Sequence, residues 1–161
     1  MQPASDELRE HGLRATTPRQ AVLAALAGAR HVTAAEIAVR LAGGRSARVS
    51  RQGLYNVLDD LTRVGLVRCI EPAGSPARYE LRVGDNHHHL VCRGCGRIDD
   101  IDCAVGVAPC LDPSEPPADL GFVVDEAEVT WWGLCASCSP LTVPAKTAEV
   151  PTAHSERRRS R

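Results

Sequence analysis

The spacing of apolar residues predicts that the first half of the chain is mainly helical. Segment 50–65 carries one apolar stripe whose members stand three or four positions apart: Leu54, Val57, Leu58, Leu61 and Val64. Ser50 is suited to begin this helix and Gly65 to end it. Because its two faces differ, we expect the helix to pack one face on a core and to expose the other.

Earlier segments also have the composition of helices. In segment 17–28, Thr17 is the expected N-cap, Pro18 takes the first helical position and Gln20 completes a capping box. Segment 33–44 repeats the pattern with its own box and stop: Thr33, Glu36 and Gly43. A shorter helix is expected over residues 5–12.

After the last helix the period changes from helical to extended. Residues 66–72 read LVRCIEP and residues 77–83 read ARYELRV, and the intervening AGSP favours a hairpin. Helices followed by a β-hairpin are typical of a winged helix-turn-helix, whose last helix enters the major groove of DNA. We therefore expect an α+β protein with a winged helix-turn-helix domain over residues 1–83.

The exposed face of helix 50–65 has the side chains of a DNA-reading surface. Four of them can contact phosphates or base edges: Arg51, Gln52, Tyr55 and Asn56. Arg14 and Arg19 lie near an earlier helix start, where contact with the DNA backbone is expected. The alternative is an ordinary three-helix bundle with a solvated basic face, and we favour DNA binding over it.

The net charge of −1 conceals a segregation along the chain. Residues 1–83 carry +4, residues 84–140 carry −8 and residues 141–161 carry +3. A basic segment suits DNA and an acidic segment suits divalent cations, which predicts two domains followed by a disordered basic tail. An unevenly charged solvated surface is the alternative. The absence of a long apolar run or a signal peptide predicts a cytoplasmic protein without membrane contact.

Seven cysteines, an odd number, argue against a disulfide framework in a reducing compartment. Four of them form two CxxC pairs: Cys92 with Cys95, and Cys135 with Cys138. Two such pairs can close a tetrahedral Zn²⁺ site without an open position, so we predict structural zinc rather than a thioredoxin-like redox motif. The long intervening loop requires structure of its own, and we expect a strand over residues 121–135.

Three consecutive histidines precede the first CxxC pair. If this segment is a strand, His87 and His89 share one face while Cys92 lies on the other. Nearby carboxylates could complete a second site: Asp99, Asp100, Asp102 and Glu80. Imidazole with carboxylate suits Fe²⁺, Mn²⁺, Zn²⁺ or Ni²⁺. The alternative is a histidine-rich surface strand that binds no ion.

Several segments together resemble the ferric uptake regulator (Fur) family of metal-dependent repressors. They read GLRATTPRQAVLAAL, SRQGLYNVLDDLTRVGLVRCI, RYELRVGDNHHHLVCRGCG and CASC, and the match covers about residues 5–140. The segments DCAVGVAPCL and DEAEVTWWGLC are similar to an actinobacterial branch that represses a neighbouring catalase-peroxidase gene. The resemblance implies a homodimer on operator DNA, with a small α/β dimerisation domain over residues 84–140.

The resemblance also implies two metal sites. It implies structural zinc at the four CxxC cysteines and a regulatory ion, Fe²⁺ or Mn²⁺ with Zn²⁺ or Ni²⁺ as alternatives, at His31, Glu80, His87, His89 and Asp100. Only the resemblance singles out His31. A third family site around His88 is not expected, because Asn86 and Ala127 replace histidines there. The arginine of the relatives' Thr-Val-Tyr-Arg is replaced by Asn56, so the operator is expected to differ.

The branch resemblance suggests a redox-responsive repressor of a catalase-peroxidase gene and of its own gene. Peroxide could oxidise the histidine ligands of a bound Fe²⁺, or it could act on Cys103 and Cys110 if their thiolates are accessible. Those two cysteines could equally be small buried hydrophobes. The alternative function is iron, zinc or nickel homeostasis without peroxide sensing. Enzyme activity is not expected, because the chain has no HxE followed by the PCxxC that zinc deaminases use.

Overall fold

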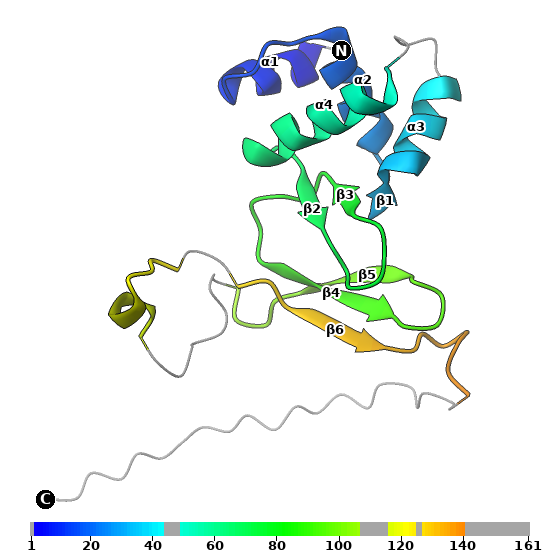
Figure 1. The fold of residues 1–161 in the computed structure, drawn as a ribbon, viewed down its shortest axis with the longest axis vertical. Helices are drawn as coiled ribbons and strands as arrows, with labels where there is room; N and C mark the ends of the chain where they lie inside the picture. Colours follow the sequence, from blue (N-terminus) through cyan, green and yellow to red (C-terminus); the bar gives the residue numbers. More distant parts are fainter. Residues whose placement is uncertain (1, 44–48, 107–115, 125–126, 141–161) are drawn as a thin grey trace, which may run out of the picture.

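The computed structural model of the chain describes residues 2–43, 49–106, 116–124 and 127–140. Helices form one end of the molecule, and two three-stranded sheets lie successively toward the other end (Figure 1). The helices are α1 (Gln2–Glu10), α2 (Thr17–Leu26), α3 (Ala34–Gly43) and α4 (Arg51–Arg63). None of the described helices combines the length and apolarity needed to cross a bilayer.

Two of the three predicted helix starts are confirmed. The Thr33 N–H donates to Glu36 Oε2 (2.7 Å) and the Glu36 N–H donates to Thr33 Oγ1 (3.2 Å), which is a reciprocal capping box. Ser50 Oγ accepts from the Gly53 N–H (3.1 Å) at the start of α4. These caps satisfy backbone donors that a helix cannot pair internally.

The predicted start of α2 is wrong. Its N-cap is Thr16 rather than Thr17, and the Thr16 side chain makes no capping hydrogen bond. Pro18 still lies in the first turn, where a missing N–H is harmless. Gln20 does not reach back to the cap because its Nε2 donates to Ser5 Oγ (2.5 Å), which joins α2 to α1.

The buried stripe predicted for α4 is confirmed for four of its five residues, because Leu54, Val57, Leu58 and Leu61 are buried. Val64 follows the end of the helix and is partly buried against the same core. The other helices each contribute buried side chains to the same cluster: Leu8, Val22, Leu26 and Ile37. Packing on α4 therefore holds the helical end together.

Replacing Leu58 with alanine should destabilise the fold strongly. Leu58 is 0% exposed, so the substitution leaves a cavity as well as losing apolar burial, and we expect a loss of about 2–5 kcal/mol in the free energy of unfolding. Val39→Ala on α3, where the side chain is 73% exposed, should change it by less than about 0.5 kcal/mol. Urea denaturation of both variants measures the difference, and equal midpoints would contradict the assigned core.

The predicted hairpin is confirmed and forms the first sheet. Strands β2 (Arg68–Ile70) and β3 (Arg78–Glu80) pair antiparallel, with Cys69 opposite Tyr79. A short strand that the sequence did not reveal, β1 (Val32–Thr33), pairs with the other edge of β3 and places Val32 opposite Tyr79. This pairing brings the residue before β1 close to the end of β3.

The second sheet has the order β5-β4-β6. Strand β4 (His87–Cys92) is central, β5 (Ile98–Asp102) pairs with it antiparallel, and β6 (Thr130–Gly133) pairs with it in parallel. The strand expected over residues 121–135 is wrong in extent, because β6 pairs only with the last four residues of β4. A short 3-10 turn, η1 (Pro117–Leu120), precedes it.

Candidate metal centres

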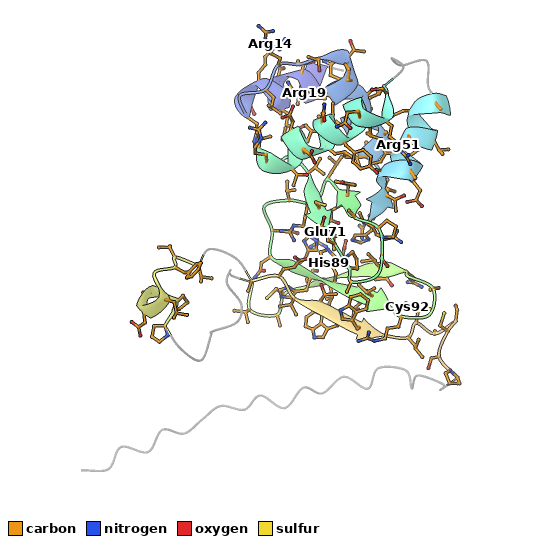
Figure 2. The ribbon with its side chains drawn as sticks, viewed as in Figure 1. Arg14, Arg19, Arg51, Glu71, His89 and Cys92 are labelled. Atoms are coloured by element: carbon orange, nitrogen blue, oxygen red, sulfur yellow. The ribbon has the colours of Figure 1, made fainter. Side chains whose placement is uncertain are left out.

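The four CxxC cysteines meet at one end of the second sheet, where strands β4 and β6 finish. Parallel strands β4 and β6 end side by side, so the turns that follow them carry the two pairs to the same place (Figure 2). All four Sγ atoms lie within 4.8 Å of one another. Cys95 Sγ and Cys135 Sγ are 3.8 Å apart, the separation of about 3.8 Å expected for sulfurs that each lie about 2.3 Å from a tetrahedral Zn²⁺.

The electrostatics of the sulfur cluster fit a cation. The Cys135 N–H donates to Cys92 Sγ (3.3 Å) and, with the N–H groups of Cys95 and Gly94, lowers the pKa of the Cys92 thiol to about 6. Contacts with Cys135 and then with the other two sulfurs raise the pKa of Cys138 to about 12. Cys92 loses its proton readily, whereas the neighbouring sulfurs disfavour deprotonation of Cys138. A bound cation is therefore needed to hold all four cysteines as thiolates.

Gly94 is required by the close approach of the two CxxC turns. A Cβ at this position would lie 2.9 Å from Cys138 Cβ and 3.0 Å from its Sγ. No larger residue fits without moving the second pair of cysteines. The glycine of the first CxxC turn is therefore part of the sulfur site's geometry.

A second cluster lies between the two sheets, around His89 (Figure 2). Each side chain comes from a different segment: His31 from the residue before β1, Glu80 from β3, His89 from β4 and Asp100 from β5. One ligand atom from each lies within 4.8 Å of the others. Two ligands therefore come from the first sheet's segments and two from the second sheet.

Strand pairing explains this convergence. His89 stands directly opposite Asp100 in the β4–β5 register, so both side chains project from the same face. His88 projects from the other face, where its ring lies 5.3 Å from that of Trp131. The strand alternation predicted from the sequence is thus present, and the register selects Asp100 from the acidic run.

The atoms of the second cluster fit a divalent cation better than a hydrogen-bond network. His31 Nε2 lies 2.7 Å from Asp100 Oδ1 and 3.1 Å from Glu80 Oε2. None of these three atoms has a partner at hydrogen-bonding geometry among the described residues, and neither does either ring nitrogen of His89. Buried polar atoms without partners are unfavourable, and a shared ion would satisfy them together.

The charges around Glu80 support the same interpretation. Burial by itself would raise the pKa of Glu80, but contacts with His31 and His89 lower it well below its usual range. Burial lowers the pKa of His31, yet its contacts with Glu80 and Asp100 raise the net value. Two ionised carboxylates in a buried pocket attract positive charge, which a divalent ion supplies without protonating the imidazoles.

His87, the fifth predicted ligand, lies beside the four-residue cluster. Its Nε2 is 3.0 Å from Glu80 Oε1 and 4.0 Å from Asp100 Oδ1, and its Nδ1 is 2.8 Å from Asp85 Oδ1. The other candidate carboxylates, Asp99 and Asp102, form ion pairs with arginines instead.

No local sequence signal marked His31. Its backbone has φ +51°, a left-handed conformation that is uncommon for residues with a Cβ. Arg78 Nη1 donates to the His31 carbonyl (3.0 Å) and holds this conformation. The direction of the His31 side chain therefore depends on a turn and a distant arginine, neither of which the chain order reveals.

Comparison with known proteins agrees with this arrangement of helices and sheets. The sequence pattern of the ferric uptake regulator family matches residues 10–105. The chain belongs to the ferric uptake regulator family. The transcriptional regulator FurA of Mycobacterium tuberculosis is 56% identical over 137 residues, 84% of this chain and 89% of the relative. The peroxide operon regulator of Bacillus subtilis is 31% identical over 142 residues, 86% and 93% of the respective chains.

A solved structure of this family shares the fold. The ferric uptake regulator from Pseudomonas aeruginosa with manganese has a TM-score of 0.64 at 25% identity, covering 83% of this chain and 98% of that chain. This Fur-family protein is accordingly an α+β transcriptional regulator and not an enzyme. Its first sheet is the wing of the winged helix-turn-helix.

The side chains proposed to contact DNA occupy the exposed face of α4. Arg51, Gln52, Tyr55 and Asn56 are all exposed, and Gln52 Nε2 donates to Asn56 Oδ1 (2.8 Å). These residues lie at the helical end of this Fur-family protein, where Figure 2 shows Arg51. The predicted DNA-reading face of α4 is therefore polar and exposed.

The two other arginines differ from each other. Arg14 is exposed, whereas Arg19 is half-buried and pairs with Asp60 of α4 (2.6 Å). Arg19 also donates to the Arg14 carbonyl (3.0 Å). Arg19 thus links α2 to α4.

The remaining cysteines have different surroundings. Cys69 packs partly buried against the core, and burial raises the pKa of its thiol. Cys103 is half-buried just after β5. Cys110 and the expected tail over 141–161 lie outside the described residues, so a redox role for Cys103 and Cys110 stays a prediction.

Proposed function

We propose that this protein is a cytoplasmic, metal-dependent repressor that binds double-stranded operator DNA as a homodimer. The observation that carries the proposal is the buried cluster of unsatisfied ligand atoms shared by the two sheets. It supports a division into a DNA-binding domain over residues 1–83 and a metal-binding dimerisation domain over residues 84–140. A ligand set that spans both parts can make DNA affinity depend on metal.

The roles of the residues follow from where they are attached. His31 and Glu80 move with the wing and helices, whereas His89 and Asp100 move with the second sheet. A bound divalent ion supplies the positive charge that brings the two carboxylates and two imidazoles together. Holding these four side chains fixes the orientation of the recognition helices relative to the dimer, so only one spacing of half-sites is matched.

The choice of metal follows from ligand chemistry. The four sulfurs suit structural Zn²⁺. The imidazole and carboxylate set suits Fe²⁺ or Mn²⁺, with Zn²⁺ and Ni²⁺ as alternatives. The manganese in the Pseudomonas aeruginosa relative supports a divalent ion of this class.

An apolar surface on the second sheet supports dimerisation. Leu90, Ile101 and Trp131 are 40–44% exposed. Leu90 stands opposite Trp131 on β6, and His88 stands opposite Ile101 on β5, so these side chains share the face opposite the regulatory cluster. Covering this face with a second copy would bury apolar area without obstructing the metal ligands.

The proposal extends to a response to peroxide and to control of a catalase-peroxidase gene and of the protein's own gene. It is supported by the similarity to the Bacillus subtilis peroxide operon regulator and by the actinobacterial branch resemblance. The histidine-containing site would be the target of oxidation, with Cys103 and Cys110 as the other candidates. Iron, zinc or nickel homeostasis is the second candidate function, favoured by the name of the family.

Retardation of a DNA duplex from upstream of the protein's own gene tests this function. Protein purified without oxygen should bind weakly alone and more tightly after Fe²⁺ or Mn²⁺ is added. Peroxide should then release the duplex from the Fe²⁺-loaded protein. Binding that never depends on metal would contradict the repressor mechanism, and metal-dependent binding that resists peroxide would select the homeostasis alternative.

Gln52→Ala should reduce operator affinity selectively. A side-chain amide that reads a base edge contributes about 1–3 kcal/mol of discrimination, so we expect a roughly 5- to 150-fold loss on the operator and little change on a scrambled duplex. Arg97→Ala, which removes an exposed side chain of the second sheet, is the control. Fluorescence anisotropy on both duplexes measures the effect, and an unchanged ratio of affinities would exclude Gln52 from base reading.

A further inference from the structure

Arg82 lies in the segment that connects the two sheets and contacts three carboxylates. Its Nε donates to Asp85 Oδ2 (2.6 Å), its Nη2 to Asp102 Oδ1 (2.5 Å) and its Nη1 to Asp100 Oδ2 (3.5 Å). Asp85 belongs to the same connection, whereas Asp100 and Asp102 belong to β5. One planar guanidinium therefore ties the connection to the strand that carries a candidate metal ligand.

Asp85 links this arginine to a histidine of the regulatory region. While Asp85 Oδ2 accepts from Arg82, its Oδ1 lies 2.8 Å from Nδ1 of the buried His87. An ionised carboxylate only accepts, so Nδ1 is the nitrogen that donates to Asp85, while Nε2 faces Glu80 Oε1 at 3.0 Å. Carboxylates orient metal-binding imidazoles in this way and increase their basicity.

The two carboxylate oxygens of Asp100 face different neighbours, the metal cluster on one side and arginines on the other. Its Oδ1 points into the cluster, 2.7 Å from His31 Nε2. Its Oδ2 lies 3.5 Å from Arg82 and 3.3 Å from Arg30, which is exposed. The arginines therefore fix which oxygen of this buried carboxylate is offered to an ion.

We propose that Arg82 and Asp85 are positioning residues of the regulatory metal site, which orient His87 and Asp100 from the interdomain connection. The inference rests on the proposed regulatory function and adds residues that touch ligands without being ligands. Because both residues lie in the connection, a change in its conformation alters the direction of two ligands. By linkage, metal binding then favours one conformation of the connection.

A surface ion pair would have no such effect, and the chain contains one for comparison. Arg97, just before β5, forms a two-point contact with Asp99 of that strand, with distances of 2.7 and 2.8 Å, and neither residue belongs to the regulatory cluster. An exposed pair of this kind contributes little. Arg97→Gln is therefore a matched control for Arg82→Gln, because each removes one arginine that pairs with a β5 aspartate.

The test is a Co²⁺ and Mn²⁺ titration of the full-length protein with zinc retained by its cysteines. Arg82→Gln and Asp85→Asn should each weaken the regulatory ion roughly 10- to 100-fold and change the visible absorption of bound Co²⁺. Arg97→Gln should match the wild type in both. Arg82→Lys should recover only part of the affinity, because one ammonium cannot replace a fork that spans three carboxylates.

The outcomes separate this inference from the function on which it rests. A zinc content and a melting temperature near those of the wild type show that a variant is folded. If Asp85→Asn does not fold, Asp85→Glu replaces it in the test. Asp85→Glu keeps the carboxylate but moves it, so it should still shift the Co²⁺ spectrum. Wild-type affinity and spectrum in the Arg82 and Asp85 variants would overturn the positioning role alone. A wild-type protein that binds no second ion, or a His89→Ala variant that binds it normally, would overturn the regulatory site itself and the inference with it.

Discussion

Replacing Cys92 with serine should release the zinc and strongly destabilise the second sheet. Cys92 ends β4, and its sulfur accepts the Cys135 N–H, so it joins the central strand to the turn after β6. Structural zinc contributes on the order of 10 kcal/mol in small domains, and a serine hydroxyl is a poor substitute for a thiolate. We expect loss of zinc, a large fall in melting temperature and loss of the dimer, measured by zinc release, thermal unfolding and sedimentation.

The matched control is Cys103→Ser, which changes a cysteine of the same domain outside the sulfur cluster. It should retain zinc and remain folded. If Cys92→Ser also keeps its zinc and melts with the wild type, the four sulfurs do not form a structural site. Removing the zinc from the wild-type protein with a chelator should reproduce the phenotype of Cys92→Ser.

The sulfur site could be anticipated because its signal is local. Each CxxC turn aims two sulfurs at one point, whatever the rest of the chain does. What the sequence could not supply was the means of bringing Cys92 and Cys135 together. That depends on the parallel pairing of β4 with β6, which are separated by a long segment. The expected strand over residues 121–135 overestimated β6 because apolar content does not show where a partner strand ends.

The regulatory cluster was only partly accessible to sequence reasoning. Alternation along one strand placed His87 and His89 on the same face, but choosing Asp100 from the acidic run required the β4–β5 register. His31 depends on a left-handed backbone, and no periodic pattern indicates that conformation. The role of Arg82 was not foreseen, because it depends on three carboxylates that meet only in the folded chain.

The helix caps also show that a local sequence pattern does not by itself determine which contact forms. The predicted box of Thr33 and Glu36 formed, and Glu36 Oε2 accepts from both the N–H and the hydroxyl of Thr33. Thr17 and Gln20 had equivalent spacing, yet α1 offered Ser5 to Gln20. Local rules predict a contact reliably only where tertiary neighbours do not provide a better one.

Replacing His31 with asparagine should uncouple DNA binding from the regulatory metal. Asparagine tolerates the left-handed backbone of this position, so the turn before β1 is retained while the imidazole is lost. His89, Asp100 and the neighbouring His87 still offer ligands from the second sheet. An ion held by them and by Glu80 is joined to the winged helix through one ligand instead of two, so we expect weaker metal binding and little metal stimulation of operator affinity.

The expected loss of metal stimulation follows from the coupling free energy between metal binding and DNA binding. Allosteric coupling of about 1–3 kcal/mol corresponds to a roughly 5- to 150-fold metal stimulation in the wild type, which should fall to near one in His31→Asn at saturating Mn²⁺. His11→Asn is the matched control, since His11 is exposed, its ring Nδ1 lies 2.9 Å from the Val64 carbonyl oxygen, and it is not one of the four residues of the cluster. Anisotropy titrations with and without Mn²⁺ measure the ratio. Full stimulation in His31→Asn would mean that the two sheets are not joined through this ligand, and the coupling would then have to pass through Glu80 alone.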